Sequence, residues 1–355
     1  MDAAPTEKQS MPISSRPNYD LDDDDADLAR WPKLRSLLVI AREILLPVYL
    51  ASDAAGMRQQ QRHSWLVLLG AIFGTLAVLC AIFELSDVIP ISRSVLSIVE
   101  LIAASIAIVV VVLGIYSALH PDWLLQRFLA EQCRFVKFHL LLNPAVWYGR
   151  TGEEMRSTVE AMSQSLRNPD EHVIHEWVTW RIQIAKRFEP LTKDIPADVV
   201  EEIVDYYKAK RLQNQQQYFD RQAKRRHRWE RWTRNVSPAC FFLSIVAAFS
   251  HFLFEWLAGE EHHGWLHFFA GVFVLLAAAL PVLAMGVRTF RAAHEFGRNK
   301  LRFEGMSYFL SEILVLAEAQ ETPSSVMPLL REAEIALDSE HRAWLRLMVE
   351  AEWFG

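Results

Sequence analysis

The stretch SWLVLLGAIFGTLAVLCAIF, Ser64 to Phe83, decides the fold class of this chain. It holds twenty consecutive residues without a charge, and nearly all of them are apolar. About twenty residues at a rise of about 1.5 Å cross a hydrocarbon core of about 30 Å, so such a run is typical of a transmembrane helix. The run begins too late in the chain, and is too long, for the apolar part of a signal peptide.

Three more apolar runs of this kind follow, at residues 95–119, 235–254 and 264–287. The 37 basic and 43 acidic residues of the 355-residue chain lie almost entirely outside the four runs. No alternating pattern of useful length predicts a strand. We therefore predict an all-α, four-pass membrane protein with two transmembrane hairpins and a helical cytoplasmic bundle.

The distribution of Lys and Arg predicts the orientation. Eight precede the first span, one lies between the first and second, twenty between the second and third, none between the third and fourth, and eight follow the fourth. Basic residues near span ends stay in the cytoplasm. Both termini and the central region are therefore predicted to be cytoplasmic, in the cell (inner) membrane.

Composition divides the chain into six parts. The first part, residues 1–32, is rich in Pro and contains the acidic run LDDDDAD, which predicts disorder. The parts are a disordered acidic tail (1–32), an amphipathic helix that Pro47 could interrupt (33–63), transmembrane hairpin 1 (64–119), a cytoplasmic helical region (120–234), transmembrane hairpin 2 (235–287) and a cytoplasmic helical tail (288–355).

The helix after the second span carries charges at a fixed spacing. Arg127, Glu131 and Arg134 fall at i, i+4 and i+7, so they share one helical face, and Trp123 stands at its entrance. One interpretation is a solvated charged face. The other is a polar seam packed against a neighbouring helix, because a helix that leaves the bilayer with an apolar stripe needs a partner to cover it.

Three short motifs lie in the helices beside the spans. The pattern W-x3-R-x2-AE-x2-R follows the first hairpin, RLQNQQQYFDRQAKRRHRWERW precedes the third span, and YLASDAAGMRQQQRH precedes the first. Together they resemble the SLATT superfamily of bacterial membrane proteins. The matching residues are Trp123, Arg127, Ala130, Glu131 and Arg134 in the first motif, Arg211, Gln215 and Tyr218 in the second, and Tyr49, Asp53 and Gln61 in the third.

This resemblance implies a multi-pass effector of bacterial conflict (anti-phage) systems. Such a protein would associate as a homo-oligomer, then form a pore or perturb the membrane when a separate cytoplasmic sensor or nucleotide-signalling protein is triggered. The chain departs from the family, whose members often have one hairpin. It also has neither G-x-G-x-x-G nor G-x-x-x-x-G-K-[ST], the usual phosphate-binding loops.

Enzymatic motifs are weak in this sequence. It has no H-E-x-x-H, C-x-x-C or G-x-S-x-G, so we predict neither an enzyme nor a cofactor. The nearest metal-site candidate is His262, His263 and His267, although imidazoles beside interfacial Trp residues also serve as membrane anchors. With Glu100, this cluster supports an alternative function as an ion or metal transporter or sensor.

Several polar or small residues lie inside the predicted spans. Glu100 and His251 are candidates for a pathway, or else interfacial groups that reach headgroups or water. Gly70 and Gly74 form a small-xxx-small pair that allows close helix packing.

A basic cluster with interleaved Trp residues directly precedes the third span. Basic and aromatic residues together suggest nucleic acid binding, but Lys and Arg beside a span bind anionic headgroups. We predict contact with membrane lipids and no nucleic acid. The cluster is Lys224, Arg225, Arg226, Arg228, Arg231 and Arg234.

Overall fold

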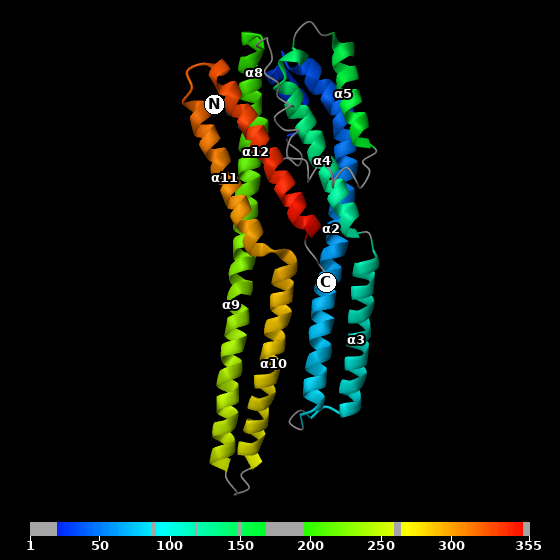
Figure 1. Ribbon diagram of the computed structural model, residues 1–355, viewed down its shortest axis with the longest axis vertical. Coiled ribbons are helices and arrows are strands. Elements are labelled where there is room, and N and C mark those ends of the chain that lie inside the picture. The colour runs from blue at the N-terminus through cyan, green and yellow to red at the C-terminus, as the bar shows by residue number, and fades with distance from the viewer. Residues whose placement is uncertain are drawn as a thin grey trace, which may run out of the picture. The chain divides into compact units, whose positions relative to one another are not determined.

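The computed structural model of the chain is built from helices (Figure 1). It describes residues 20–86, 90–117, 119–147, 151–167, 195–258 and 264–350, and these ranges contain no strand. The all-helical prediction is confirmed for them. Four of the helices are long and apolar enough to cross a membrane, which indicates membrane association.

The helices run through two compact units, each described separately below. Unit 1 takes its described residues from 1–58, 121–221 and 303–351, and unit 2 takes them from 59–120 and 222–302. The helical elements are α1 (Asp25–Arg30), α2 (Arg35–Glu84), α3 (Arg93–Tyr116), α4 (Leu119–Leu141), η2 (Pro144–Val146), α5 (Gly152–Arg167), α8 (Ala197–Tyr207), η3 (Lys208–Leu212), α9 (Gln213–Ala258), α10 (Gly264–His294), α11 (Phe296–Glu318) and α12 (Pro323–Glu350).

Unit 2 contains two antiparallel helix pairs. A Cβ added at Gly70 of α2 would meet the side chain of Val110 on α3, and Ser97 of α3 donates to the Glu84 carboxylate of α2 at 2.7 Å. In the second pair, Ser244 of α9 donates to the Ala277 carbonyl of α10 at 2.8 Å. These contacts hold α3 against α2, and α10 against α9.

The surface of unit 2 is strongly apolar. Leu101, Ile245 and Phe249 each expose 68 or 69% of their area, and many neighbours expose nearly as much. A protein in water rarely exposes an apolar surface this extensive. Hydrocarbon is the solvent that such helices suit.

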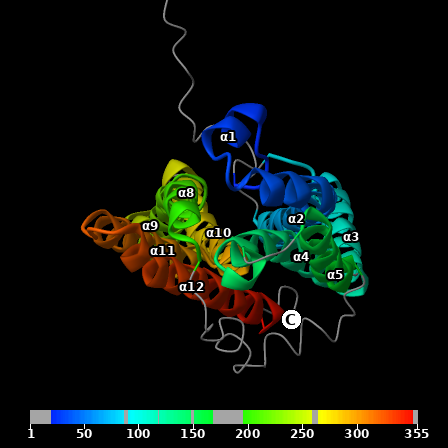
Figure 2. The same cartoon turned by 90° about the horizontal axis from the view of Figure 1, so that it is seen from above.

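Unit 1 buries an apolar core. Its buried side chains include Leu37 and Leu45 of α2, Phe138 of α4 and Leu330 of α12. α12 packs against α8, as Figures 1 and 2 both show. These helices form the frame that positions the polar groups described in the next subsection.

Two helix boundaries differ from the prediction. α2 continues through Pro47 as one helix of 50 residues, because Leu45 and Tyr49 on either side are buried and hold the backbone. The second span and the charged helix after it are separate elements: α3 ends at Tyr116, Ser117 is extended, and α4 begins at Leu119. Pro121 lies in the first turn of α4, where a missing N–H costs no helical hydrogen bond.

A buried ionic network as the candidate functional site

Five cationic side chains gather inside unit 1. Lys137 and Lys210 are buried to within 1% of complete, and Arg211 is buried to the same degree. Arg134 is mostly buried, and Arg127 is 30% exposed. Charged groups of this kind are almost never buried without a counter-charge, so each needs an anionic partner nearby.

The acidic segment, residues 20–27, supplies three of these partners. Asp20 and Asp23 are almost completely buried, and Asp27 is 8% exposed. The Asp24 and Asp27 side chains each accept the other's backbone N–H, and Asp24 thereby caps the N-terminus of α1. A capping box of this kind satisfies two helix-end donors at once.

The prediction of disorder is therefore wrong for residues 20–32, while residues 1–19 lie outside the described ranges. Leu21, Leu28 and Trp31 are buried, and Trp31 packs edge-on against Tyr206 at 4.9 Å between ring centroids. The acidic residues that suggest a solvated tail serve instead to neutralise the cations inside unit 1.

Lys137 of α4 is surrounded by acceptors from the acidic segment. Its Nζ donates to the carbonyls of Asp20 at 2.9 Å and Leu21 at 3.3 Å, and to Asp23 Oδ2 at 2.6 Å. Burial lowers the pKa of Lys137 below its ordinary value, and the Asp23 carboxylate opposes that shift.

Asp23 also meets donors from the second half of the bundle. Lys210 lies 3.5 Å from Asp23 Oδ1 and 2.5 Å from Asp27 Oδ2, and the Tyr206 hydroxyl donates to Asp23 Oδ1 at 2.9 Å. Burial and the nearby carboxylates raise the pKa of Tyr206 well above its ordinary value, so the phenol stays a neutral donor.

Asp20 contacts a second set of donors. Arg134 Nε lies 2.8 Å from Asp20 Oδ2, Gln215 Nε2 donates to the same oxygen at 3.3 Å, and Arg211 Nη1 lies 3.9 Å away. Arg211 binds Glu334 of α12 through two N–H groups, at 2.8 and 3.2 Å. Burial raises the pKa of Glu334, and Arg211 opposes that shift.

The three charged residues of the predicted seam lie together on α4. Glu131 Oε1 is 2.6 Å from both Arg127 Nη2 and Arg134 Nη1, and its side chain is 12% exposed. Burial pushes the pKa of Glu131 upward, but Arg134 and Arg127 outweigh it and hold that pKa well below its ordinary value. Arg134 also donates to the Tyr49 hydroxyl at 2.5 Å, and Arg127 lies 3.6 Å from Asp53.

The other residues of the family-like motifs fall into two groups. Tyr49, Asp53, Arg211 and Gln215 belong to the ionic network, and the buried Trp123 packs edge-on against a Trp of α12 at 5.7 Å. Tyr218 is half-buried and interacts electrostatically with Arg127 at the margin of the network. Outside the network are Ala130, which is buried, and Gln61, which is exposed.

A π-helical turn carries two of the cations. It spans Lys208–Leu212 between α8 and α9, and both Lys210 and Arg211 within it are buried. Single π-helical turns occur often at functional sites. The sequence gives no sign of this turn, which places two adjacent cations inside the unit.

In unit 2 the polar and small residues predicted inside the spans have specific places. Glu100 is half-buried, and the His251 ring lies 3.0 Å from the Ala270 carbonyl of α10. A Cβ at Gly70 would make ordinary contact, and one at Gly74 would meet nothing within 4 Å. The close approach is instead at Gly286 of α10, where a Cβ would lie 2.5 Å from Thr75 Oγ1 of α2.

The predicted histidine cluster is only partly described. His262 and His263 lie outside the described ranges, and His267 Nδ1 lies 3.6 Å from Glu255 Oε2. Among the described residues, no three His, Cys, Asp or Glu side chains are grouped to hold a metal ion.

The basic cluster before the third span lies on α9. Five of its residues are exposed, and Arg226 is half-buried, 6.0 Å from the ring centroid of Phe296. Arg234 pairs with Glu230 at 3.4 Å. The exposed residues are Lys224, Arg225, Arg228, Arg231 and Arg234.

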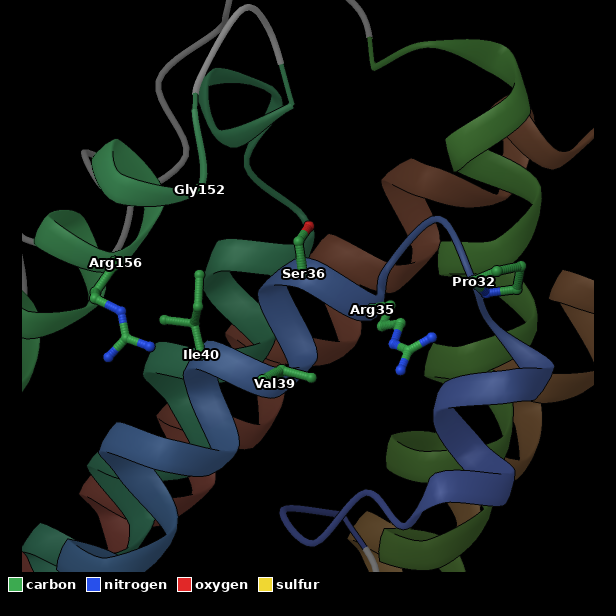
Figure 3. A pocket seen from close by; sticks show the side chains of 7 residues that line it. All are labelled: Pro32, Arg35, Ser36, Val39, Ile40, Gly152 and Arg156. Carbon is green, nitrogen blue, oxygen red and sulfur yellow. The ribbon is translucent and has the colours of Figure 1, made fainter.

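A shallow hollow of about 580 Å³ opens on the surface of unit 1, between the start of α2 and α5 (Figure 3). Arg35 and Arg156 line it from the two helices, and Arg156 forms an ion pair with Glu43. The polar side chains that line it, Arg35, Ser36 and Arg156, are exposed. It therefore lacks the buried, convergent polar groups that the ionic network has.

Comparison of the chain with protein-family models, with curated proteins and with solved structures finds no match. Membership of the SLATT superfamily therefore stays a prediction.

Proposed function

We propose that this chain is a four-pass membrane effector, with unit 2 in the bilayer and unit 1 as its cytoplasmic, trigger-sensing part. The apolar surface of unit 2 suits hydrocarbon, and the buried charges of unit 1 suit a bundle folded in water. Lys and Arg are concentrated before the first span, between the second and third spans and after the fourth, which favours the cytoplasmic side for both termini.

Chain connectivity supports coupling between the two units. α2 contributes Tyr49 and Asp53 to the ionic network and continues as the apolar run that begins at Ser64. The helical run from α8 through η3 to α9 likewise carries Lys210 and Arg211 and then the third apolar run. A rearrangement of the network therefore acts directly on two of the four predicted spans.

The resemblance to the SLATT superfamily suggests what the protein does to the membrane once it is triggered. In that reading, copies of the chain associate in the inner membrane, and a cytoplasmic signal during phage infection makes them open a pore or perturb the bilayer. Exposed Lys and Arg of the basic cluster support contact with anionic headgroups, at about 1 kcal/mol per residue.

The observation that carries the proposal is the ionic network itself. Burying charges costs free energy, and unit 1 could be equally stable with an apolar core in place of the network. Buried ion pairs contribute little net stability, whereas breaking one is strongly destabilising. Such a network suits an element with two alternative arrangements.

The test measures membrane potential in cells that express the full chain. Asp23→Asn removes the charge shared by Lys137 and Lys210, so we expect this variant to depolarise the membrane at expression levels where the wild type does not. Asp22→Asn, next to it and half-exposed, is the matched control and should behave as the wild type. An unchanged potential with both variants at equal membrane abundance would contradict the proposed function.

A companion experiment tests the orientation. Reporter fusions truncated after Pro90, Arg167, Ala258 and Glu350 sample each segment between the spans and the C-terminal end. Cytoplasmic signals are expected only after Arg167 and Glu350. A periplasmic signal after Arg167 would place unit 1 outside the cell and overturn the proposal.

A further inference from the structure

The acidic segment, residues 20–27, is bound inside unit 1 through its carboxylates. Its carboxylates are met by two separate donor sets, both supplied by helices from elsewhere in the chain. Asp20 meets Arg134, Gln215 and Arg211, while Asp23 meets Lys137, Lys210 and Tyr206. Every one of these groups is a cation or a hydrogen-bond donor.

Without the acidic segment, the charges of the network do not balance. Among the described residues, the ion pairs that the five cations form outside the acidic segment involve three carboxylates, those of Asp53, Glu131 and Glu334. The segment adds the carboxylates of Asp20, Asp23 and Asp27. Buried cations without counter-ions are costly, so the site requires added negative charge whenever unit 1 is folded.

Two of the donors, Arg211 and Arg134, are also held in place by groups other than the acidic segment. The Arg211 guanidinium lies 4.8 Å from the Phe138 ring centroid, and Arg211 is fixed by its paired hydrogen bonds to Glu334. Arg134 is held by Glu131 and Tyr49. Because these two guanidinium groups are fixed independently, they can accept another anion of the same shape and charge.

We propose that these two donor sets form a binding site for a compact ligand with two or more phosphoryl groups, and that residues 20–27 are its intramolecular competitor. Guanidinium groups bind phosphate through paired hydrogen bonds, and each phosphoryl group carries more acceptor oxygens than a carboxylate. In terms of the proposed function, on which this part rests, the acidic segment holds unit 1 in its resting arrangement and the ligand replaces it.

Tethering determines how tightly the wild-type chain binds such a ligand. A segment joined to its own site acts at an effective concentration on the order of millimolar. Leu21, Leu28 and Trp31 add apolar anchoring next to the carboxylates. The wild type should therefore bind a free polyanion weakly, and a chain whose segment has lost its charges should bind it well.

The experiment uses the full chain in detergent, with inorganic pyrophosphate and tripolyphosphate as probes and melting temperature as the readout. In Asp20→Asn/Asp23→Asn, saturating probe should raise Tm by about 5 °C, while the wild type shifts by less than about 1 °C. The control adds Lys137→Met and Lys210→Met to the double variant, which removes the two cations that face Asp23. This quadruple variant should not respond to either probe.

Two results would overturn the site: no saturable shift in the double variant, or an equal shift in the quadruple variant, which would indicate binding elsewhere. If the double variant is not recovered folded, Asp23→Asn is purified with and without pyrophosphate, and an unchanged yield of folded protein overturns the site equally. Because Tm and yield do not depend on membrane potential, failure of this inference and failure of the proposed function are separate results.

Discussion

Units 1 and 2 place their charged and apolar side chains in opposite ways. Unit 1 buries Lys137 and Lys210 almost completely, whereas unit 2 leaves Leu101 and Phe249 more than two-thirds exposed. In water both choices are unfavourable, one for the cost of burying charge and the other for exposed apolar area. Under the proposed function, unit 1 lies in water and unit 2 in lipid, so the two units would be stabilised by different forces.

In unit 1, stability depends on charge partners that come from distant parts of the chain. Asp23 and Lys137, for example, are separated by 114 residues and pair at 2.6 Å. In unit 2, lipid is as apolar as the side chains, so burial gives little driving force between helices and close backbone packing matters more. Substitutions should accordingly be most costly at charges in unit 1 and at small residues in unit 2.

The largest effect is expected at Asp23. Asp23→Ala leaves Lys137 and Lys210 without their shared carboxylate, and removing one member of a buried ion pair costs about 3–5 kcal/mol. The melting temperature of the detergent-extracted protein should fall by about 10 °C.

The neighbouring Asp22 provides the control for that substitution. It is half-exposed and lies 3.6 Å from the half-exposed Arg42, an arrangement worth about 0–1 kcal/mol. Equal Tm changes for Asp22→Ala and Asp23→Ala would mean that unit 1 does not bury its charges, and the contrast between the units would fail.

The helices of both units could largely be predicted from the sequence. Uncharged runs of twenty residues leave few alternatives to a long helix, and the charge spacing on α4 brought Arg127, Glu131 and Arg134 to one face. Helical spacing shows which residues share a face. It does not show what lies opposite, so Asp20 was not predicted as a partner of Arg134.

Composition alone does not show that the acidic segment is ordered. Four consecutive Asp residues favour disorder on average, but the segment also contains signals of order. Asp24 and Asp27 have the spacing of a capping box, and Leu28 and Trp31 follow within one turn. The second signal is the presence of Lys and Arg on otherwise apolar helix faces. Such cations need acidic partners, and these partners must come from another segment of the chain.

The next largest effect is expected at Glu131. Glu131→Ala should cost about 3 kcal/mol, near the lower limit for a buried pair, because Arg127 keeps Asp53 and Arg134 keeps Asp20. Glu43→Ala is the control, since Glu43 forms a half-exposed ion pair with Arg156. Thermal unfolding measures both, and a loss at Glu131 no greater than at Glu43 would favour a merely solvated face.

Acid should weaken the same contact in unit 1. The pKa of Glu131 is lower in the folded chain than its ordinary 4.5, so its stabilising contribution is complete above that pH and is lost as pH falls toward the folded pKa. Each pH unit below about 4.5 should cost about 1.4 kcal/mol through this group. Glu131→Gln should flatten the dependence of Tm on pH between about 5 and 3, and an unchanged slope would contradict the assignment.

The smallest effect is expected in unit 2, at Gly286. A Cβ there would lie 2.5 Å from Thr75 Oγ1, so Thr75 must leave its χ1 rotamer or α10 and α2 must separate to accommodate it. Overpacking of this kind costs about 1–3 kcal/mol.

Gly74→Ala is the control, because a Cβ at Gly74 meets nothing within 4 Å and should change stability by less than about 0.5 kcal/mol. Thermal unfolding in detergent compares the two variants. If Gly74→Ala proved the more damaging, the helices of unit 2 would pack through the predicted small-xxx-small face rather than through Gly286, and close packing at α10 would no longer explain how the apolar unit holds together.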